Sequence, residues 1–474
     1  MTAVSSAKAS YKWTAMFIIC LGTFIGGMDL TTVNIALPRL SEVFGAEPRV
    51  VIWIQIAYLL VGTGLMLALG GLGDLIGRKR VYVLGLVVFS LGLGLSALAP
   101  NLEFLILARV VQAVGQAMEV STSTAIITAA FPSQERGKAI GIISSVVAAG
   151  LGVGPIVGGI LLDVLDWRAI FYLRLPLVLG AAIMARWLLR EERAQTRRPT
   201  FDLAGAATVF VGLGSILVWV NQGPRWGWTS PPSLLLAILG LASMTAFLAV
   251  EKRAVRPVLD LGLFRDRLFT AATASMVLYF VALPFFSLLL PFYLIQGAGF
   301  SSAKAGLYLA IFPISRAALA APSGWLSDRI GSRLLCSLGM VVVAIGLFAV
   351  GRLGASPSTW GLVLSMGALA LGSAAFGSPN TSAIMGSVPP DRLGTASGMV
   401  ATGRQVGQSL GMAVAGSVFA YRQGVWLERL PPTGGQALAM VHSYADALSV
   451  ATVVALLGAA TSLVRGGHQQ GEKR

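Results

Sequence analysis

The stretch GGLGDLIGRKR at residues 70–80 returns as SGWLSDRIGSR at residues 323–333. Three matched pairs lie 254 residues apart, namely Gly70 and Gly324, Asp74 and Asp328, and Gly77 and Gly331. A second set lies 257 residues apart and matches Gly137, Ala139, Gly141, Gly150 and Gly154 with Gly394, Ala396, Gly398, Gly407 and Gly411. Because both sets have nearly the same offset, the sequence predicts two related halves that run in the same direction, as in transporters built from parallel repeats.

The composition is that of a membrane protein. Of the 474 residues, 55% are apolar and only 12% are charged, whereas a soluble domain carries about 25% charged residues. The apolar residues form stretches of about twenty, the length that crosses the hydrocarbon core, and short basic clusters separate them. The 56 glycines and 21 prolines agree with this reading, since both are more frequent in membrane helices than in soluble ones.

Several other classes of protein are disfavoured. The net charge of +15 is scattered in small groups between apolar segments, which indicates membrane topology rather than nucleic-acid binding. Cys20 and Cys336 lie in separate apolar stretches, and the sequence contains neither a zinc-binding spacing nor a phosphate-binding loop. The apolar run from Trp13 is too long for a signal peptide and is predicted to be the first span. We therefore expect no metal, cofactor, nucleic-acid partner or enzymatic activity.

Fourteen apolar stretches are long enough to cross a bilayer. They are residues 13–37, 50–72, 81–99, 103–130, 138–162, 168–189, 202–222, 233–250, 268–295, 303–327, 334–352, 360–386, 395–421 and 443–464. The even count places both termini on one side. With cytoplasmic termini, 23 Lys and Arg residues lie on the cytoplasmic side and eight on the other. The positive-inside rule therefore predicts a cytoplasmic-membrane protein with both termini inside.

Six spans in each half leave two spans over. The stretch 202–250 lies between the halves and is flanked by basic linkers, so it is predicted to be an inserted helix pair. The expected fold is an all-α polytopic membrane protein with 14 spans. Its parts are an N-terminal six-helix half (1–190), an inserted pair with linkers (191–259) and a C-terminal six-helix half (260–474).

Four motifs carry a family resemblance. They are GGLGDLIGRKR (70–80), ARVVQAVGQA (108–117), GVGPIVGG (152–159) and MDLTTVNIALP (28–38). Together they resemble the major facilitator superfamily, in particular its fourteen-span drug:proton antiporter branch, and the likeness covers nearly the whole chain. Two positions depart from the pattern, because Leu75 replaces the usual Arg and Ala113 replaces the usual Gly.

The resemblance implies a proton-coupled antiporter that exports amphipathic organic compounds, as multidrug-efflux proteins do. The two halves would rock around a site near the membrane midplane, as a monomer and with the proton gradient as energy source. An exporter of an anionic or lipid-like amphiphile is the alternative with the same mechanics. A membrane sensor that transports nothing is the more remote alternative.

Two groups of residues are expected to serve the motion. The first is a cytoplasmic latch at the repeated loops, comprising Gly70, Asp74, Gly77, Arg78, Asp328, Arg329 and Arg333. A plain tight loop that obeys the positive-inside rule is the alternative. The second is a thin, bendable antiporter helix with Gly150, Gly154, Pro155, Gly158 and Gly159. Small residues at such spacing also permit close helix packing by itself.

Six charged residues lie deep inside the predicted spans, away from the span ends, namely Asp29, Arg109, Glu119, Arg174, Arg316 and Arg404. Each costs about 2.5–3.5 kcal/mol at a helix centre. The resemblance places the spans of Asp29 and Arg109 side by side, so the two are expected to pair, either structurally or for proton coupling. Neither histidine lies inside a predicted span, so a carboxylate must titrate. Asp29, Glu119 and Arg109 are therefore the predicted proton-coupling residues.

Glu119 follows Arg109 by ten residues and lies on a similar helix face. It is either a second proton or cation site or the partner of an arginine, which would be Arg174 if packing brings the spans of these two residues together. Arg316 and Arg404 have no acid deep inside any span of their half, so they are expected to face a water-filled cavity or an anionic group.

The remaining prediction concerns the substrate cavity, whose walls the resemblance assigns to the central spans. Its expected residues are Asn34, Gln112, Tyr279, Phe280, Phe286, Phe376, Asn380, Arg316 and Arg404. Such a cavity suits a bulky amphiphile. Aromatic side chains in a membrane span also pack as a core, so packing is the alternative for the tyrosine and the phenylalanines.

Overall fold

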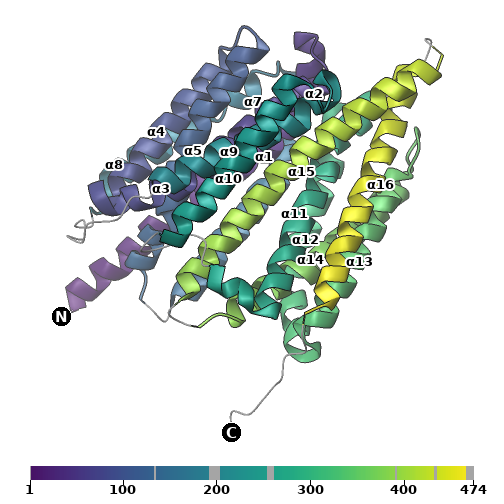
Figure 1. Ribbon diagram of the computed structural model, residues 1–474. Helices are drawn as coiled ribbons and strands as arrows, with labels where there is room; N and C mark the ends of the chain where they lie inside the picture. Colours follow the sequence, from purple (N-terminus) through teal and green to yellow (C-terminus); the bar gives the residue numbers. More distant parts are fainter. Residues whose placement is uncertain are drawn as a thin grey trace. The chain divides into compact units, whose positions relative to one another are not determined.

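The computed structural model describes residues 2–132, 135–191, 203–253, 261–389, 392–431 and 435–465, which form helices and short connections (Figure 1). The chain divides into two compact units. Unit 1 comprises Met1–Val250 together with Leu294–Pro313, and unit 2 comprises Glu251–Tyr293 together with Ile314–Arg474. The fold is therefore all-α, as predicted.

Unit 1 contains the first nine α-helices and the tenth as far as Val250. These are α1 (Thr2–Phe44), α2 (Pro48–Val51), α3 (Trp53–Ile76), α4 (Arg78–Ala97), α5 (Leu102–Ala130), α6 (Arg136–Val164), α7 (Ala169–Tyr172), α8 (Leu175–Leu188), α9 (Leu203–Trp226) and α10 (Pro231–Arg253). Within it α4 packs on α5 and α8, α1 packs on α6, and α3 packs on α5 and α9.

The second part of the chain begins with the short 3₁₀ turn η2 (Leu261–Arg265). The elements that follow are α11 (Arg267–Phe292), η3 (Tyr293–Gly297), α12 (Ser302–Ile330), α13 (Ser332–Gly351), α14 (Thr359–Gly386), α15 (Leu393–Arg429) and α16 (Gly435–Leu463). In unit 2 α13 packs on α14 and α16, and α11 packs on α15 and α16. The first residues of α12 belong to unit 1 and the rest to unit 2.

Every predicted span falls on helical segments, although the span 50–72 covers parts of α2 and α3 and the span 168–189 covers both α7 and α8. Within the described part of the chain, twelve helices are long and apolar enough to cross a membrane. The two other predicted spans correspond to α9, whose apolar stretch is the shorter Ala207–Gly223, and to α15. Polar residues such as Arg404 and Gln408 lower the hydropathy of α15. The polytopic membrane fold is thus confirmed, while the count of fourteen spans stays a prediction.

The two halves repeat their helix contacts at glycine positions. A β-carbon added at Gly115 would lie 2.6 Å from the carbonyl oxygen of Gly85, where α5 crosses α4. A β-carbon added at Gly372 would lie 2.6 Å from the carbonyl oxygen of Gly339, where α14 crosses α13. The two contacts are related by the offsets of 254 and 257 residues. The parallel repeat of the sequence is therefore also a repeat of backbone packing.

The repeated loops share one backbone feature. Gly77 lies between α3 and α4 with φ of 102°, and Gly331 lies between α12 and α13 with φ of 84°. Only glycine adopts such angles without strain. Each loop can therefore join its two helices through a single residue, which explains why this glycine recurs 254 residues later.

The predicted inserted pair, α9 and α10, belongs to unit 1 as far as Val250 and packs there on α3 through α9. The indole nitrogen of Trp53 in α3 donates to Oδ1 of Asn221 in α9 at 2.8 Å. The ring of Phe210 in α9 occupies the space that a side chain at Gly64 of α3 would need. Helix α9 in turn packs on α10 where Gly212 faces Gly240. The domain boundaries at 190 and 260 stay a prediction.

Candidate functional site

The buried centre of unit 1 is the carboxylate of Asp29 in α1. Its Oδ2 accepts a hydrogen bond from Nη1 of Arg109 in α5 at 2.7 Å. Its Oδ1 accepts from Nη1 of Arg174 at 2.6 Å and from the amide of Gln112 at 3.0 Å. Asp29, Arg109 and Gln112 are each 0% exposed. The predicted pairing of Asp29 with Arg109 is therefore present.

Neutral side chains from α1 and α3 complete this cluster. Gln55 of α3 accepts from Nη2 of Arg109 at 3.2 Å and donates to Asn34 at 2.7 Å. The guanidinium carbon of Arg109 lies 4.1 Å from the ring centroid of Tyr58, a cation–π contact. Asn34 and Gln112, both predicted to line the substrate cavity, therefore belong to the hydrogen-bond network of Asp29.

The structure corrects the expected partner of Arg174. This residue precedes α8 and was expected beside Glu119, but its guanidinium binds Asp29 instead. The reason is that α8 packs against α1 as well as α4, which brings Arg174 to the same level as Asp29. One carboxylate thus pairs with two arginines, and in the part of the chain that the structure describes, Nε of Arg109 and Nη2 of Arg174 have no hydrogen-bond partner. The cluster carries one surplus positive charge.

Among the described residues, the buried side chain of Glu119 has no ion-pair partner. Its side chain is 2% exposed, and Oε1 forms no hydrogen bond. The carboxyl group lies where α5 meets α1 and α4, because a β-carbon at Gly22 would lie 2.6 Å from both Oε1 of Glu119 and the hydroxyl of Tyr82. That hydroxyl donates to the carbonyl of Ile18 at 3.2 Å. A buried ionised carboxylate without a cation or donor is costly, so this environment suits the neutral acid.

Helices α1 and α5 carry matching stripes that connect these sites. On α5 the polar residues are Arg109, Gln112, Gln116 and Glu119, at the three- and four-residue spacing of one helix face. On α1 the facing residues are Asp29, Gly26 and Gly22, because Gln112 bonds Asp29, Gln116 lies against Gly26 and Glu119 lies against Gly22. Tyr58 bridges the stripe by donating to Gln116 at 3.2 Å. The stripe spans ten residues of α5, about 15 Å.

The polar stripe of α5 is not repeated at the matched positions of unit 2. Gly92 packs on Gln112 in unit 1, and Gly346 packs on Leu369 in unit 2, so Leu369 occupies the position of Gln112. By the same offset of 257 residues, Phe376 occupies the position of Glu119. Unit 2 therefore repeats the helix packing of α4 and α5 but not their polar stripe.

The predicted antiporter helix, α6, packs closely against α1 and against the first residues of α12, all within unit 1. A β-carbon at Gly150 would lie 2.5 Å from the carbonyl oxygen of Phe24 in α1, and Thr32 donates to the carbonyl of Gly154 at 3.1 Å. On its other side Gly159 meets the backbone of Ser302. Pro155 meets Gly306, and Gly158 meets Ile35. Every small residue assigned to this helix thus makes a close contact.

The predicted cavity aromatics form the interior of unit 2. Tyr279, Phe280, Phe286 and Phe376 are all buried. The ring of Tyr279 lies 5.0 Å from that of Phe280 and 5.1 Å from that of Phe376. Packing, the alternative interpretation, therefore describes their contacts within unit 2, and a role in substrate binding stays a prediction.

Arg316 and Arg404 also belong to unit 2. The guanidinium of Arg404 lies 5.3 Å from the ring centroid of Phe280, and Nη2 of Arg316 lies beside Gly377. Within the described residues, neither arginine forms an ion pair. Their positive charges are thus uncompensated, as the sequence indicated.

One buried arginine escaped the sequence analysis. Arg465 follows α16, is 0% exposed and donates to Oδ1 of Asn380, while its Nε and Nη1 form no hydrogen bond to any described residue. The sequence placed it among the basic residues at the cytoplasmic end of a span, where an arginine is ordinary. No local signal distinguishes it, because its burial depends on α13 and α14 packing around the end of α16.

The latch residues are described in part. The side chains of Asp74 and Asp328 lie outside the described residues, and Gly70 is a helical residue of α3. Arg329 stacks on Trp325 at 3.8 Å, and Arg333 donates to the carbonyl of Leu463 at 3.0 Å. The predicted role of these loops as a latch therefore stays a prediction.

Taken together, two repeated helical units and a buried ionic cluster define a membrane transporter built from parallel repeats. The chain belongs to the Major Facilitator Superfamily, whose sequence model matches residues 19–412. It is similar to the riboflavin transporter RibZ of Clostridioides difficile, with 32% identity over 449 residues that cover 94% of this chain and 96% of that protein. It is also similar to the multidrug resistance protein Stp of Mycobacterium tuberculosis, with 33% identity over 402 residues that cover 84% of this chain and 74% of that protein.

The structural comparison agrees on the fold. A solved structure from work on substrate recognition in proton dependent oligopeptide transporters superposes with a TM-score of 0.69 at 17% sequence identity. The match covers 95% of this chain and 98% of that one. At this level of identity the likeness concerns the fold alone.

Proposed function

We propose that this protein is a proton-coupled antiporter that exports amphipathic organic compounds across the cytoplasmic membrane, as a member of the drug:proton antiporter branch. Both termini are cytoplasmic in this proposal. The name of the relative Stp, a multidrug resistance protein, supports export of such compounds. The name of RibZ, a riboflavin transporter, supports a flat heteroaromatic compound as an alternative substrate.

The observation that carries proton coupling is the buried carboxyl group of Glu119, whose Oε1 has no hydrogen-bond partner among the described residues. A proton carrier in a membrane must be stable when neutral and able to ionise in another conformation. Glu119 meets the first condition, since Oε1 is buried without a donor. Asp29 differs, because two guanidinium groups and an amide stabilise its ionised form. We therefore assign proton exchange to Glu119 and assign Asp29 to holding the two arginines in place.

The polar stripe of α1 and α5 gives this assignment a coupling mechanism. Tyr58 contacts the guanidinium of Arg109 and donates a hydrogen bond to Gln116, which lies three residues before Glu119 on the same face of α5. Ionisation of Glu119 would add a negative charge about 15 Å along α5 from a cluster with a surplus positive charge. Movement of α1 against α5 then changes the energy of both sites together, which is what antiport requires.

Transport by proteoliposomes tests the proposal. The purified protein is reconstituted with a pH gradient of either sign, and the movement of cationic and anionic fluorescent dyes is followed. Glu119→Gln should bind dye but transport it no faster under a gradient than without one. The matched control is Glu103→Gln, which changes an exposed glutamate at the start of the same helix and should transport like the natural protein.

Two results would separate the parts of this proposal. Wild-type gradient-driven transport by Glu119→Gln would remove Glu119 from proton coupling. Dye transport by the natural protein that ignores the pH gradient would overturn proton coupling itself.

A second substrate class has its own support in unit 2. Arg316 and Arg404 are uncompensated cations in membrane helices, so an anionic or zwitterionic amphiphile would be a favourable partner. Replacement of both by Gln should slow transport of anionic dyes more than that of cationic dyes. Equal slowing of both dyes would assign the two arginines to structure instead.

A further inference from the structure

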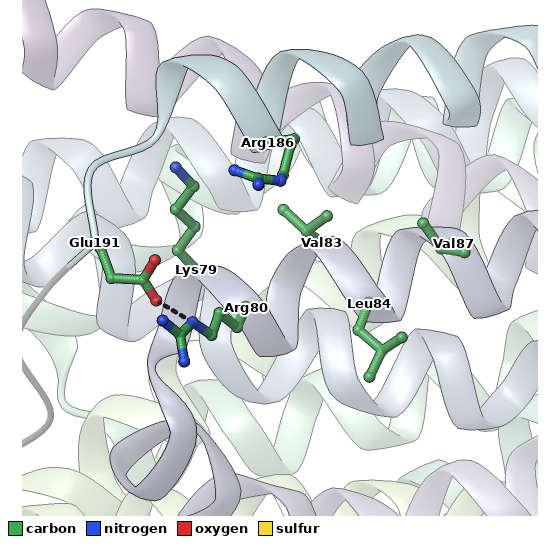
Figure 2. A pocket seen from close by; sticks show the side chains of 7 residues that line it. All are labelled: Lys79, Arg80, Val83, Leu84, Val87, Arg186 and Glu191. Carbon is green, nitrogen blue, oxygen red and sulfur yellow. Dashed lines mark ion pairs between the residues drawn. The ribbon is translucent and has the colours of Figure 1, made fainter.

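A pocket of about 330 Å³ lies at the surface of unit 1, where α4 begins and α8 ends (Figure 2). None of its residues takes part in the Asp29 cluster or in the polar stripe. Helix α4 supplies two basic residues and an apolar wall, α8 supplies a third basic residue, and an acid follows α8. The lining residues are Lys79, Arg80, Val83, Leu84, Val87, Arg186 and Glu191.

The polar end of this pocket has a surplus of positive charge. Glu191 pairs with Arg80, with Nε of the arginine 3.0 Å from Oε1 of the glutamate. Within the described residues, Lys79 and Arg186 have no carboxylate partner. Among the described residues, the pocket therefore holds two cations without a carboxylate partner, and they come from two different helices.

The other end of the pocket is apolar. Figure 2 shows Val83 beside Arg186, and Leu84 and Val87 further along α4, away from Lys79. Leu84 is 48% exposed and Val87 is 46% exposed, so this surface is open on the outside of the helix. In a membrane span such a surface faces hydrocarbon chains.

We propose that this pocket binds the phosphate headgroup of an anionic phospholipid from the cytoplasmic leaflet, with an acyl chain along α4. The phosphate would lie between Lys79 and Arg186. Charge complementarity favours this occupant, because basic pockets between helices on the cytoplasmic side are suited to anionic headgroups. The positive-inside rule places the start of α4 on that side. A zwitterionic headgroup would instead bring its own ammonium group toward two cations.

The apolar wall distinguishes a lipid from a free anion. Inorganic phosphate would use only the basic end, whereas a phospholipid would use both the basic end and the exposed side chains of α4. By joining α4 to α8, the bound lipid would stabilise the contact between these helices. This inference does not depend on the direction or the coupling of transport.

Binding by the purified full-length protein tests the inference. Native mass spectrometry and thermal unfolding in a neutral detergent are measured with phosphatidylglycerol, phosphatidylcholine and inorganic phosphate. Phosphatidylglycerol should bind and raise the unfolding temperature more than the other two. The double variant Lys79→Gln/Arg186→Gln should bind it on the order of 25-fold more weakly, at about five-fold for each charge removed.

Matched variants separate the pocket from general basicity. Lys138→Gln/Arg265→Gln removes the same charge from exposed residues on the expected cytoplasmic side and should bind phosphatidylglycerol like the natural protein. Lys79→Arg should also retain binding. Leu84→Gln should weaken the binding of phosphatidylglycerol but not of phosphate.

Three results would overturn the inference. Unchanged binding of phosphatidylglycerol to Lys79→Gln/Arg186→Gln would show that the lipid binds elsewhere. Equal binding of phosphatidylcholine would indicate a nonspecific lipid belt. Phosphate binding as tight as that of the lipid, together with no effect of Leu84→Gln, would make the pocket a site for a free anion.

Discussion

Arg174 donates a hydrogen bond to Asp29 at 2.6 Å, although 145 residues separate them in the chain. This contact decides the charge balance of unit 1. It gives Asp29 a second arginine in addition to Arg109, and it leaves Glu119 without a cation. Asp29 and Glu119 therefore have opposite environments, one suited to a charged carboxylate and one to a neutral acid.

Removal of the Asp29 charge should destabilise the protein strongly. Asp29→Asn leaves two buried arginines without an anion, and breaking a buried pair in this way costs about 3–5 kcal/mol. The double variant Asp29→Asn/Arg174→Gln removes one of those cations and should recover part of the loss. Denaturant unfolding in detergent measures both. A double variant less stable than Asp29→Asn alone would contradict the proposed balance of charges.

A similar coupling is expected in unit 2 between Arg465 and Asn380. Each replacement, Arg465→Met or Asn380→Leu, leaves a buried polar partner unsatisfied. The double variant removes both groups, so the two losses should not add, with a coupling energy of about 0.5–3 kcal/mol in a double-mutant cycle. Arg329→Met serves as a control because Arg329 is exposed. Strict additivity of Arg465→Met and Asn380→Leu would show that their contact contributes nothing.

The repeated glycine contacts should be equally intolerant of a methyl group. Gly372→Ala would bring a β-carbon to 2.6 Å from a backbone oxygen of α13, whereas Gly367 in the same helix has open space. Overpacking of this kind costs about 1–3 kcal/mol, and Gly367→Ala should be neutral or slightly stabilising. Gly115→Ala should behave like Gly372→Ala, and Gly94→Ala like Gly367→Ala. Thermal unfolding of the four variants measures this, and equal tolerance at all four sites would refute it.

Asp163 should stabilise the start of α12. Its carboxylate accepts from the backbone nitrogen of Ser302 at 3.0 Å and from that of Ala303 at 2.8 Å, so a residue of α6 caps a helix 139 residues further along the chain. Loss of a helix cap costs about 1 kcal/mol. Asp163→Ala should lower the free energy of unfolding by about this amount, and Asp163→Asn, which keeps one acceptor, by less. Denaturant unfolding that gives the natural value for Asp163→Ala would contradict a capping role.

Much of the fold followed from the sequence by itself. Span-length apolar stretches predict helices because backbone groups in lipid must form their hydrogen bonds within the segment. The internal repeat was visible in the sequence because glycines recur at matched positions. Gly77 and Gly331 are examples, since each adopts a positive φ that its own turn requires. Helix formation and glycine turns are thus determined by each residue and its immediate neighbours in the chain.

Partnerships inside the bundle required the tertiary structure. The sequence identified Asp29, Glu119 and Arg174 as charges in predicted spans, but an arginine can pair with any acid that packing brings within reach. Only the contact of α8 with α1 assigned Arg174 to Asp29, and only the packing at the end of α16 buried Arg465. Local sequence determines which segments are helices, whereas helix packing determines which buried charge is compensated, because the energy of a buried charge depends on neighbours that are distant in the chain.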